Sequence, residues 1–265
     1  MKKFLLTCLI FLCANSVIAA PIEIEEHSGI YHIVLSGNSM KKRIQFVSST
    51  DLKTNKEIHE LTKSKFTINT GFFDPKNQKT ISYIVNKGVT IEDPLTNEDL
   101  VTNPILRQNL KKIVNRTEFR ITECDNKYQY SIVPHNAPVE FACNVVTSAQ
   151  GGPQLLPKLR LEEEFFILKD EDGNIIRQSA SVLEKTARTV IGLKGDEVHI
   201  LIVTNKNPKT IFEVRDLCKS LGLENAMAFD GGSSTSLNYK KINVTSTQNH
   251  LNDTGRRLKS FMIIK

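Results

Sequence analysis

The chain has 265 residues, 24% of them charged, and a formal net charge of +6. It carries no dense basic stripe with interleaved aromatic residues, which argues against a nucleic-acid-binding protein. The length suits one sizeable domain or two small ones and leaves ample material for a buried core.

Residues 1–19 are predicted to be a secretory signal peptide. Lys2 and Lys3 give a basic start, and the apolar run 4–13 is too short to span a bilayer. Ala19 supplies a small residue at the cleavage point. An uncleaved anchor is the alternative interpretation. We therefore expect an exported protein, periplasmic or secreted, that has no membrane span after signal cleavage.

A first strand–helix–strand unit is expected near the start of the mature chain. Residues 43–49 have a strand pattern, 52–64 a polar helix pattern, and 66–74 a strand pattern that ends in a glycine–aromatic turn. Asn69 and Gly71 lie where this last strand ends.

A second unit follows the same plan further along the chain. Residues 198–204 form a nearly continuous β-branched run, which is typical of a buried strand. A helix over 211–221 begins with a capping box of Thr210 and Glu213. The next apolar run, AMAF, ends at Asp230.

Both units thus end with a polar side chain beside glycine, Asn69 near Gly71 and Asp230 before Gly231. Functional groups often lie at the carboxyl ends of sheet strands, where loops leave a crevice open. We expect Asn69 and Asp230 to lie close together.

The rest of the chain is less regular. Residues 75–145 form an insertion in which 97–114 is predicted to be partly helical and 116–145 rich in strands. Residues 184–204 have the pattern of a hairpin whose turn is KGDE, and 256–265 that of a final strand. The expected fold class is α+β, with a mixed β-sheet core and packed helices in a single globular domain.

Cys124, Cys143 and Cys218 remain after signal cleavage. Cys124 and Cys143 flank a strand-like segment, and in an oxidising compartment they either pair across it or stay free. Cys218 lies on the apolar face of the predicted helix and is expected to be a buried thiol. The sequence has no CxxC pair and no HExxH motif, so we assign no metal site and no cofactor.

Asp230 raises a choice between a turn and a functional site. Asp-Gly favours tight turns. A hairpin needs only one glycine, however, whereas Gly231 and Gly232 together allow backbone N–H groups to line an anion site, with hydroxyl groups from Ser233 and Ser234 beside them. The chain has neither a Walker phosphate loop nor a G-x-S-x-G nucleophile elbow.

Aromatic and basic residues raise similar choices. Phe72 and Phe73 follow a strand and either pack in the core or face a crevice, where a ring can stack on a sugar. Arg188 precedes an apolar strand, a placement that suits an arginine holding a phosphate from a rigid element as well as a surface arginine. Arg256 presents the same alternatives.

Four motifs, INTGFF, GGPQLL, RTVIGL and AFDGGSS, occur in this order, and together they resemble the phosphodiester glycosidase family. The resemblance runs from about Phe66 to the C-terminus and leaves the middle insertion unmatched. INTGFF matches the family's Asn-Gly-Gly-Phe-Phe element, with Thr70 in place of the first glycine. Ser233 stands where a third glycine is common, and Ser260 where asparagine is frequent.

The other motifs match residue by residue. Gly152 and Pro153 correspond to the family's Gly-Pro turn, and Arg188 and Gly192 to its Arg-x-x-x-Gly strand. The segment from Asp230 to Ser234 corresponds to its Asp-Gly-Gly-x-Ser signature. Residues 20–265 are therefore expected to form a phosphodiester glycosidase-like domain.

The resemblance implies hydrolysis of the glycosidic bond of a sugar-1-phosphodiester, of the N-acetylglucosamine-1-phosphodiester type or within a phosphate-linked envelope glycan. We hypothesise that Asp230 supplies the carboxylate, that Arg188 holds the phosphate and that Asn69 positions the sugar or the water. The expected substrate-binding residues are Gly71, Phe72, Phe73, Gly152, Gly231, Gly232, Ser233, Ser234 and Arg256, with Gly231 and Gly232 donating backbone N–H groups. The alternatives are a non-catalytic envelope module that binds anionic glycans and a hydrolase of a phosphate-linked polymer.

Overall fold

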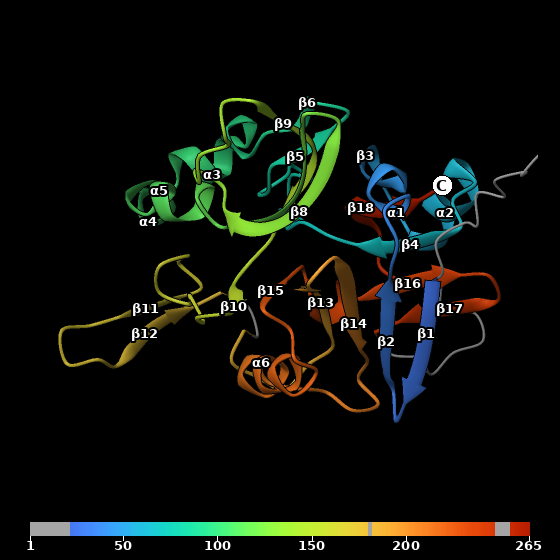
Figure 1. Ribbon diagram of the computed structural model, residues 1–265. Coiled ribbons are helices and arrows are strands. Elements are labelled where there is room, and N and C mark those ends of the chain that lie inside the picture. The colour runs from blue at the N-terminus through green and yellow to red at the C-terminus, as the bar shows by residue number, and fades with distance from the viewer. Residues whose placement is uncertain (1–21, 180–181, 247–254) are drawn as a thin grey trace, which may run out of the picture.

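The computed structural model describes residues 22–179, 182–246 and 255–265 (Figure 1). The predicted signal peptide, residues 1–19, lies outside the described residues. Within the described ranges, no helix has both the length and the apolar character needed to cross a membrane.

Three large sheets and one separate hairpin make up most of the described structure. The first sheet has the order β1 (Ile22–His27), β2 (Ile30–Leu35), β14 (Glu197–Val203), β13 (Arg188–Lys194), β15 (Asn225–Ala228) and β10 (Gln154–Leu156). The second has the order β17 (Ile242–Thr245), β16 (Ser236–Tyr239), β4 (Phe66–Asn69), β18 (Leu258–Ile264) and β3 (Ile44–Lys53). The third has the order β6 (Val89–Glu92), β5 (Ile84–Asn86), β9 (Cys143–Gln150), β7 (Thr117–Cys124) and β8 (Lys127–Pro134). The hairpin joins β11 (Ile167–Lys169) to β12 (Ile175–Gln178).

Helices are fewer and mostly short. They are α1 (Met40–Arg43), α2 (Asn55–Thr62), α3 (Glu98–Thr102), α4 (Pro104–Gln108), α5 (Leu110–Val114) and α6 (Ile211–Ser220), with 3₁₀ turns η1 (Pro94–Thr96) and η2 (Gly232–Ser234). The two longest, α2 and α6, each begin with a capping box. The one predicted for α6 is confirmed, since the N–H of Glu213 donates to the hydroxyl of Thr210 at 3.1 Å.

The prediction of a mixed sheet is wrong, because every strand pair in the described residues is antiparallel. The two strand–helix–strand units are nonetheless present, as β3–α2–β4 and β14–α6–β15. In each unit a third strand separates the two helix-linked strands. The C-terminal strand β18 lies between β3 and β4, and β13 lies between β14 and β15, so each pairing is antiparallel.

One hydrophobic core joins the three large sheets. It includes Ile33 and Ile200 from the first sheet, Phe46 and Met262 from the second, and Phe119 from the third. Helix α6 packs on the other face of the first sheet, where Val214 joins a separate apolar cluster. Helix α2 covers the second sheet in the same way (Figure 1). The fold is therefore β-rich, with few helices.

Several predicted elements are confirmed in the remaining chain. Residues 184–204 contain the hairpin β13–β14, with Lys194 paired to Glu197 across its turn. The predicted final strand is β18, which takes an interior position in the second sheet. The insertion divides into α3–α5 and the strands β7–β9, as its sequence indicates.

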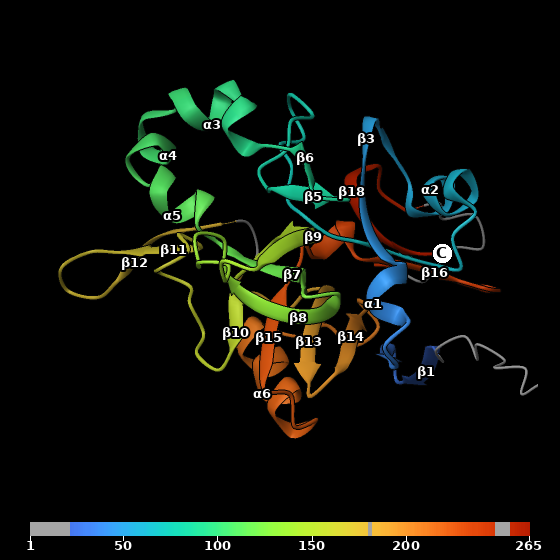
Figure 2. The ribbon, with the colours of Figure 1, turned by 45° about the horizontal axis from the view of Figure 1, so that its top comes forward.

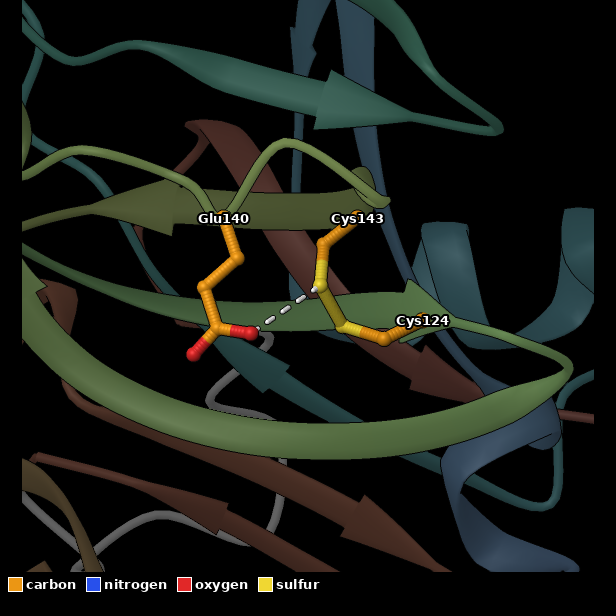
Figure 3. Close-up of a disulfide and its surroundings, with 3 residues drawn as sticks. All are labelled: Cys124, Glu140 and Cys143. Atoms are coloured by element: carbon orange, nitrogen blue, oxygen red, sulfur yellow. Dashed lines mark hydrogen bonds between the residues drawn. A yellow bond between two sulfur atoms is a disulfide. The ribbon is translucent and has the colours of Figure 1, made fainter.

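Cys124 and Cys143 form a disulfide between the paired strands β7 and β9, with their Cα atoms 4.3 Å apart (Figure 3). The carboxylate of Glu140 lies 3.9 Å from the Cys143 Sγ atom. Cys218 is a buried free thiol on α6, as predicted.

The insertion helices α3–α5 and the hairpin β11–β12 lie on the same side of the molecule in both views (Figures 1 and 2). Leu100 and Ile113 from the helices pack against Phe165 and Leu168 beside and within the hairpin. This contact brings two irregular parts of the chain together at one edge of the sheets.

Candidate active site

A cavity of about 430 Å³ lies where the ends of β4 and β15, the insertion helices and the start of the hairpin region meet. Its charged lining side chains, among the described residues, are Asp230, Arg116, Arg177, Arg188 and Arg256. Four guanidinium groups around one carboxylate give the cavity an excess of positive charge. Such a cavity favours an anionic ligand.

Asn69 and Asp230 meet, as expected from the sequence. The Asn69 amide nitrogen donates to the main-chain carbonyl of Asp230 at 2.6 Å. Its carbonyl oxygen accepts from the Thr189 hydroxyl at 2.7 Å and from the Ser236 N–H at 3.0 Å. Asn69 is 1% exposed and does not line the cavity. It therefore fixes the backbone that carries Asp230 and does not itself face the cavity.

The carboxyl group of Asp230 lies in the cavity wall with only part of its surface open to solvent. Desolvation by the surrounding protein raises its pKa to about 6. A hydrogen bond from Ser234, the charge of Arg256 and the N–H of Gly231 oppose this shift. A carboxyl group with such a pKa changes its charge close to neutral pH, which suits a general base.

The expectation that Gly231 and Gly232 both present N–H groups to a ligand is wrong. The N–H of Gly232 donates to the carbonyl of Ala187 at 2.8 Å. The N–H of Gly231 is directed at the carboxylate of Asp230. Both glycines line the cavity, so their lack of side chains leaves room beside Asp230. A Cβ atom on Gly231 would lie 2.9 Å from the Ala187 carbonyl oxygen.

Arg188 lines the cavity, but much of its hydrogen-bonding capacity is directed at the main chain. Its Nε donates to the carbonyl of Lys209 at 3.1 Å, and its Nη2 donates to the carbonyls of Val182 and Glu184 at 3.0 and 2.6 Å. The side chain is 7% exposed, and burial lowers its pKa to about 10. The Nε and Nη2 groups of Arg188, which were predicted to hold a phosphate, therefore donate to main-chain carbonyls instead.

Arg256 is better placed to approach a ligand. Its Nη1 donates to the hydroxyls of Ser233 and Ser234 at 3.2 and 3.3 Å. Its guanidinium carbon lies 5.1 Å from the ring centroid of Phe73. Because Ser234 also bonds Asp230, a short polar chain links the cation of Arg256 to that carboxylate.

Arg116 and Arg177 line the cavity and were not identified from the sequence. Arg116 lies 6% exposed, with its guanidinium carbon 4.1 Å from the ring centroid of Phe166 and 5.6 Å from that of Phe72. Burial lowers the Arg116 pKa to about 10. The guanidinium carbon of Arg177 lies 4.1 Å from the ring centroid of Phe165. These arginines come from the insertion and the hairpin, which carry none of the four motifs, so no sequence signal pointed to them.

Gly152 lines the cavity, and a buried carboxyl group occupies the space that a side chain at this position would need. A Cβ atom on Gly152 would lie 2.2 Å from Oε2 of Glu164. The other carboxyl oxygen of Glu164 accepts from the Thr117 hydroxyl at 2.6 Å and from the Gln154 N–H at 3.2 Å. Burial raises the pKa of Glu164. The main-chain carbonyl of the same residue accepts from Nε of Arg116 at 3.0 Å, so Glu164 braces this wall of the cavity.

Gly71 lies behind the cavity rather than in its lining. Its N–H donates to the hydroxyl of Ser260 at 3.0 Å, and the Thr70 hydroxyl donates to the same atom at 3.0 Å. A Cβ atom on Gly71 would lie 2.7 Å from the Cβ of Ser82. Ser260, for which no role was predicted, thus holds the turn that leads to Phe72.

Most residues proposed from the sequence come together in this cavity. Those that line it are Phe72, Phe73, Gly152, Arg188, Asp230, Gly231, Gly232, Ser233 and Arg256. Those that support it from behind are Asn69, Gly71 and Ser234. Over the described ranges, no group of three or more His, Cys, Asp or Glu is arranged to hold a metal ion.

Comparisons with solved structures identify proteins of similar fold. A zebrafish N-acetylglucosamine-1-phosphodiester alpha-N-acetylglucosaminidase catalytic domain, auto-inhibited by its pro-peptide, aligns with a TM-score of 0.64 and 12% identity over 95% of this chain and 84% of its own. A hypothetical protein from Synechocystis aligns with a TM-score of 0.58 and 12% identity over 92% of this chain and 61% of its own. A Burkholderia pseudomallei protein described as exported aligns with a TM-score of 0.54 and 10% identity, covering 89% and 73% of the two chains.

Comparison with family profiles identifies the family of this chain. A search of curated protein sequences gave no match. The profile of the phosphodiester glycosidase family, in contrast, matches residues 62–265, which include every motif named above and all the charged residues that line the cavity. The chain therefore belongs to the phosphodiester glycosidase family.

Proposed function

We propose that this protein is an exported hydrolase that cleaves the glycosidic bond of a sugar-1-phosphodiester and releases a free sugar and a phosphomonoester. Family membership supports a hydrolase of phosphodiester glycosides. The observation that carries the proposal is the placement of one carboxylate, Asp230, among four arginines in a single cavity. This arrangement matches a substrate with an anionic phosphate beside a carbon that becomes positively charged.

In the proposed reaction the bond between the anomeric carbon and the phosphate oxygen breaks, and the phosphomonoester leaves with the electron pair. The oxygen of a water molecule forms the new bond to the anomeric carbon. Asp230 stabilises the oxocarbenium-like centre and accepts the proton that this water loses, which then passes to solvent. Because the phosphate is a good leaving group, the reaction needs little protonation of the departing oxygen.

The arginines hold the phosphate in this proposal. Arg256 approaches from the side of Asp230, and Arg116 from the side of Phe72 and Phe166. Arg188 contributes positive charge to the cavity while its bonds to main-chain carbonyls keep it rigid. Fixed cations of this kind need no reorganisation as charge develops on the leaving phosphate.

An N-acetylglucosamine-1-phosphodiester is the substrate we propose to test first, because the zebrafish protein of similar fold is named for that activity. Two observations support export. The Cys124–Cys143 disulfide is of a kind that persists in oxidising compartments. A Burkholderia protein of similar fold is described as exported.

The test compares wild-type protein with Asp230→Asn and with Asp172→Asn, which changes an exposed aspartate between β11 and β12. Each is incubated with UDP-N-acetylglucosamine and with an aryl N-acetylglucosamine-1-phosphodiester, and free sugar is followed. We expect release by wild type and by Asp172→Asn, and a loss of about 10³-fold or more in Asp230→Asn. Binding of either compound without release by wild type would contradict hydrolysis and favour a glycan-binding module.

A further inference from the structure

The cavity has two chemically different ends. At one end Asp230 lies with Ser233 and Arg256. This end offers a carboxylate, hydroxyl groups and a cation, which are the groups that a sugar and its phosphate require.

The other end is walled by aliphatic side chains. Ile81 precedes β5, and Leu100, Leu106 and Ile113 come one each from α3, α4 and α5. These four residues belong to one apolar cluster with Phe165, so the wall is continuous. Three polar lining side chains lie beside Phe165 and Phe166. The guanidinium groups of Arg177 and Arg116 stand over these two rings, and the hydroxyl of Ser179 donates to the main-chain carbonyl of Phe165 at 3.3 Å.

Arg116 adjoins the aliphatic wall, since its N–H donates to the main-chain carbonyl of Ile113 at 3.3 Å. Its guanidinium group faces the rings of Phe72 and Phe166, whereas Phe73, the residue after Phe72, lies under Arg256 at the carboxylate end. A phosphate held by Arg256 and Arg116 would therefore direct its sugar toward Asp230. Its second ester group would point toward the aliphatic wall.

We propose that the alcohol esterified to the phosphate is an aliphatic chain, so that the substrate is an amphiphilic glycosyl-1-phosphodiester. This inference rests on the proposed function and narrows its substrate class. An aliphatic chain buries its surface against leucine and isoleucine side chains, with a gain that grows with each methylene group. A nucleoside or a second sugar would instead leave its polar edges facing a wall whose side chains cannot hydrogen-bond to them.

The test uses two synthetic N-acetylglucosamine-1-phosphodiesters that differ only in the alcohol, methanol in one and decanol in the other. Both are kept below the concentration at which the decyl compound forms micelles. The readout is the ratio of kcat/KM for the decyl to the methyl compound, in which any loss of folded protein cancels. For wild type we expect a ratio of at least about ten, since a single methylene group in an apolar pocket already gives that discrimination.

Two variants of α4 provide a matched pair. Leu106→Asn places an amide in the aliphatic wall, and we expect it to lower the decyl-to-methyl ratio by about tenfold. Ile105→Asn changes the preceding residue, which is 56% exposed and does not line the cavity, and we expect it to leave the ratio unchanged.

The outcomes separate this inference from the proposed function. Cleavage of the methyl compound with a ratio near one would overturn the aliphatic substrate and leave the glycosidase activity in place. A higher kcat/KM for UDP-N-acetylglucosamine than for the decyl compound would do the same. No sugar release from any of the three compounds would overturn both.

Discussion

The side-chain amide of Asn69 holds the main chain of Asp230 through a hydrogen bond of 2.6 Å, although the two residues are 161 positions apart. Asn69 ends β4 in the second sheet, and Asp230 follows β15 in the first. This one side chain therefore joins two sheets at the point where the candidate carboxylate enters the cavity.

Replacing Asn69 with alanine removes three hydrogen bonds at a buried site. The Thr189 hydroxyl, the Ser236 N–H and the Asp230 carbonyl each lose a partner. We expect Asn69→Ala to lower the free energy of unfolding by about 3 kcal/mol. Turnover by the folded fraction should fall by about 100-fold, because the carboxylate loses its fixed position.

Chemical denaturation and steady-state kinetics, run on the same preparation, check both values. Asn144→Ala, at an exposed site on β9, is the control, with an expected change within about 0.5 kcal/mol. Full activity of folded Asn69→Ala would show that Asn69 does not position the carboxylate.

The pH dependence of turnover should follow the ionisation of Asp230. With a pKa of about 6, the carboxylate is present above that pH, so kcat/KM should fall about tenfold per pH unit below it. The positive charge of Arg256 lowers this pKa, so Arg256→Gln should move the inflection to higher pH. A pH–rate profile for each protein measures the shift. An inflection that stays in place, or moves to lower pH, would argue against this coupling.

Asp230 should also reduce the stability of the fold at neutral pH. Its pKa rises from 3.8 to about 6 on folding, chiefly through desolvation. For an acid with a raised folded-state pKa, stability falls as pH rises from about 4 to about 6 and then stays level. We expect Asp230→Asn to be more stable than wild type by about 3 kcal/mol at pH 7. The gain should vanish near pH 4. Unfolding curves at the two pH values test this, and a variant that is less stable at pH 7 would refute it.

Gly152, which lines the cavity, and Gly173, which does not, form a matched pair for alanine substitution. Both have positive φ angles, +97° and +84°, but a Cβ atom on Gly173 would meet nothing within 4 Å. A Cβ atom on Gly152 would meet the carboxyl group of Glu164, which is held through its other oxygen and is fully buried. We expect Gly173→Ala to lose about 1 kcal/mol of stability through backbone strain. Gly152→Ala should lose about 2 kcal/mol more through overpacking. Equal losses in thermal or chemical unfolding would show that Glu164 moves aside freely.

Local sequence patterns predicted much of this fold. The two strand–helix–strand units, the hairpin over 184–204 and the meeting of Asn69 with Asp230 follow from apolar periodicity and from polar residues at strand ends. The antiparallel pairing could not be predicted in this way. It arises because β18, from the C-terminus, lies between β3 and β4, and sequence periodicity carries no information about such long-range order.

The residues of the candidate site that belong to motifs were predicted from the sequence. Those that come from the insertion and the hairpin were not. Asp230 and Arg256 line the cavity as expected. Arg116 and Arg177 lie in segments without a motif, and their position depends on how those segments pack on the sheets. The bonds of Arg188 to main-chain carbonyls likewise depend on loop positions that no side-chain pattern specifies.

The most direct test of the central claim is the fate of the oxygen of water. Wild type and Asp230→Asn would be given an N-acetylglucosamine-1-phosphodiester in water enriched in ¹⁸O, and the phosphomonoester would be analysed by mass spectrometry. The phosphomonoester is the product to analyse, because the anomeric oxygen of a free sugar exchanges with water. Attack at the anomeric carbon predicts a phosphomonoester without ¹⁸O from wild type and little product from Asp230→Asn. An ¹⁸O atom in the phosphomonoester would place the attack at phosphorus and contradict a glycosidase.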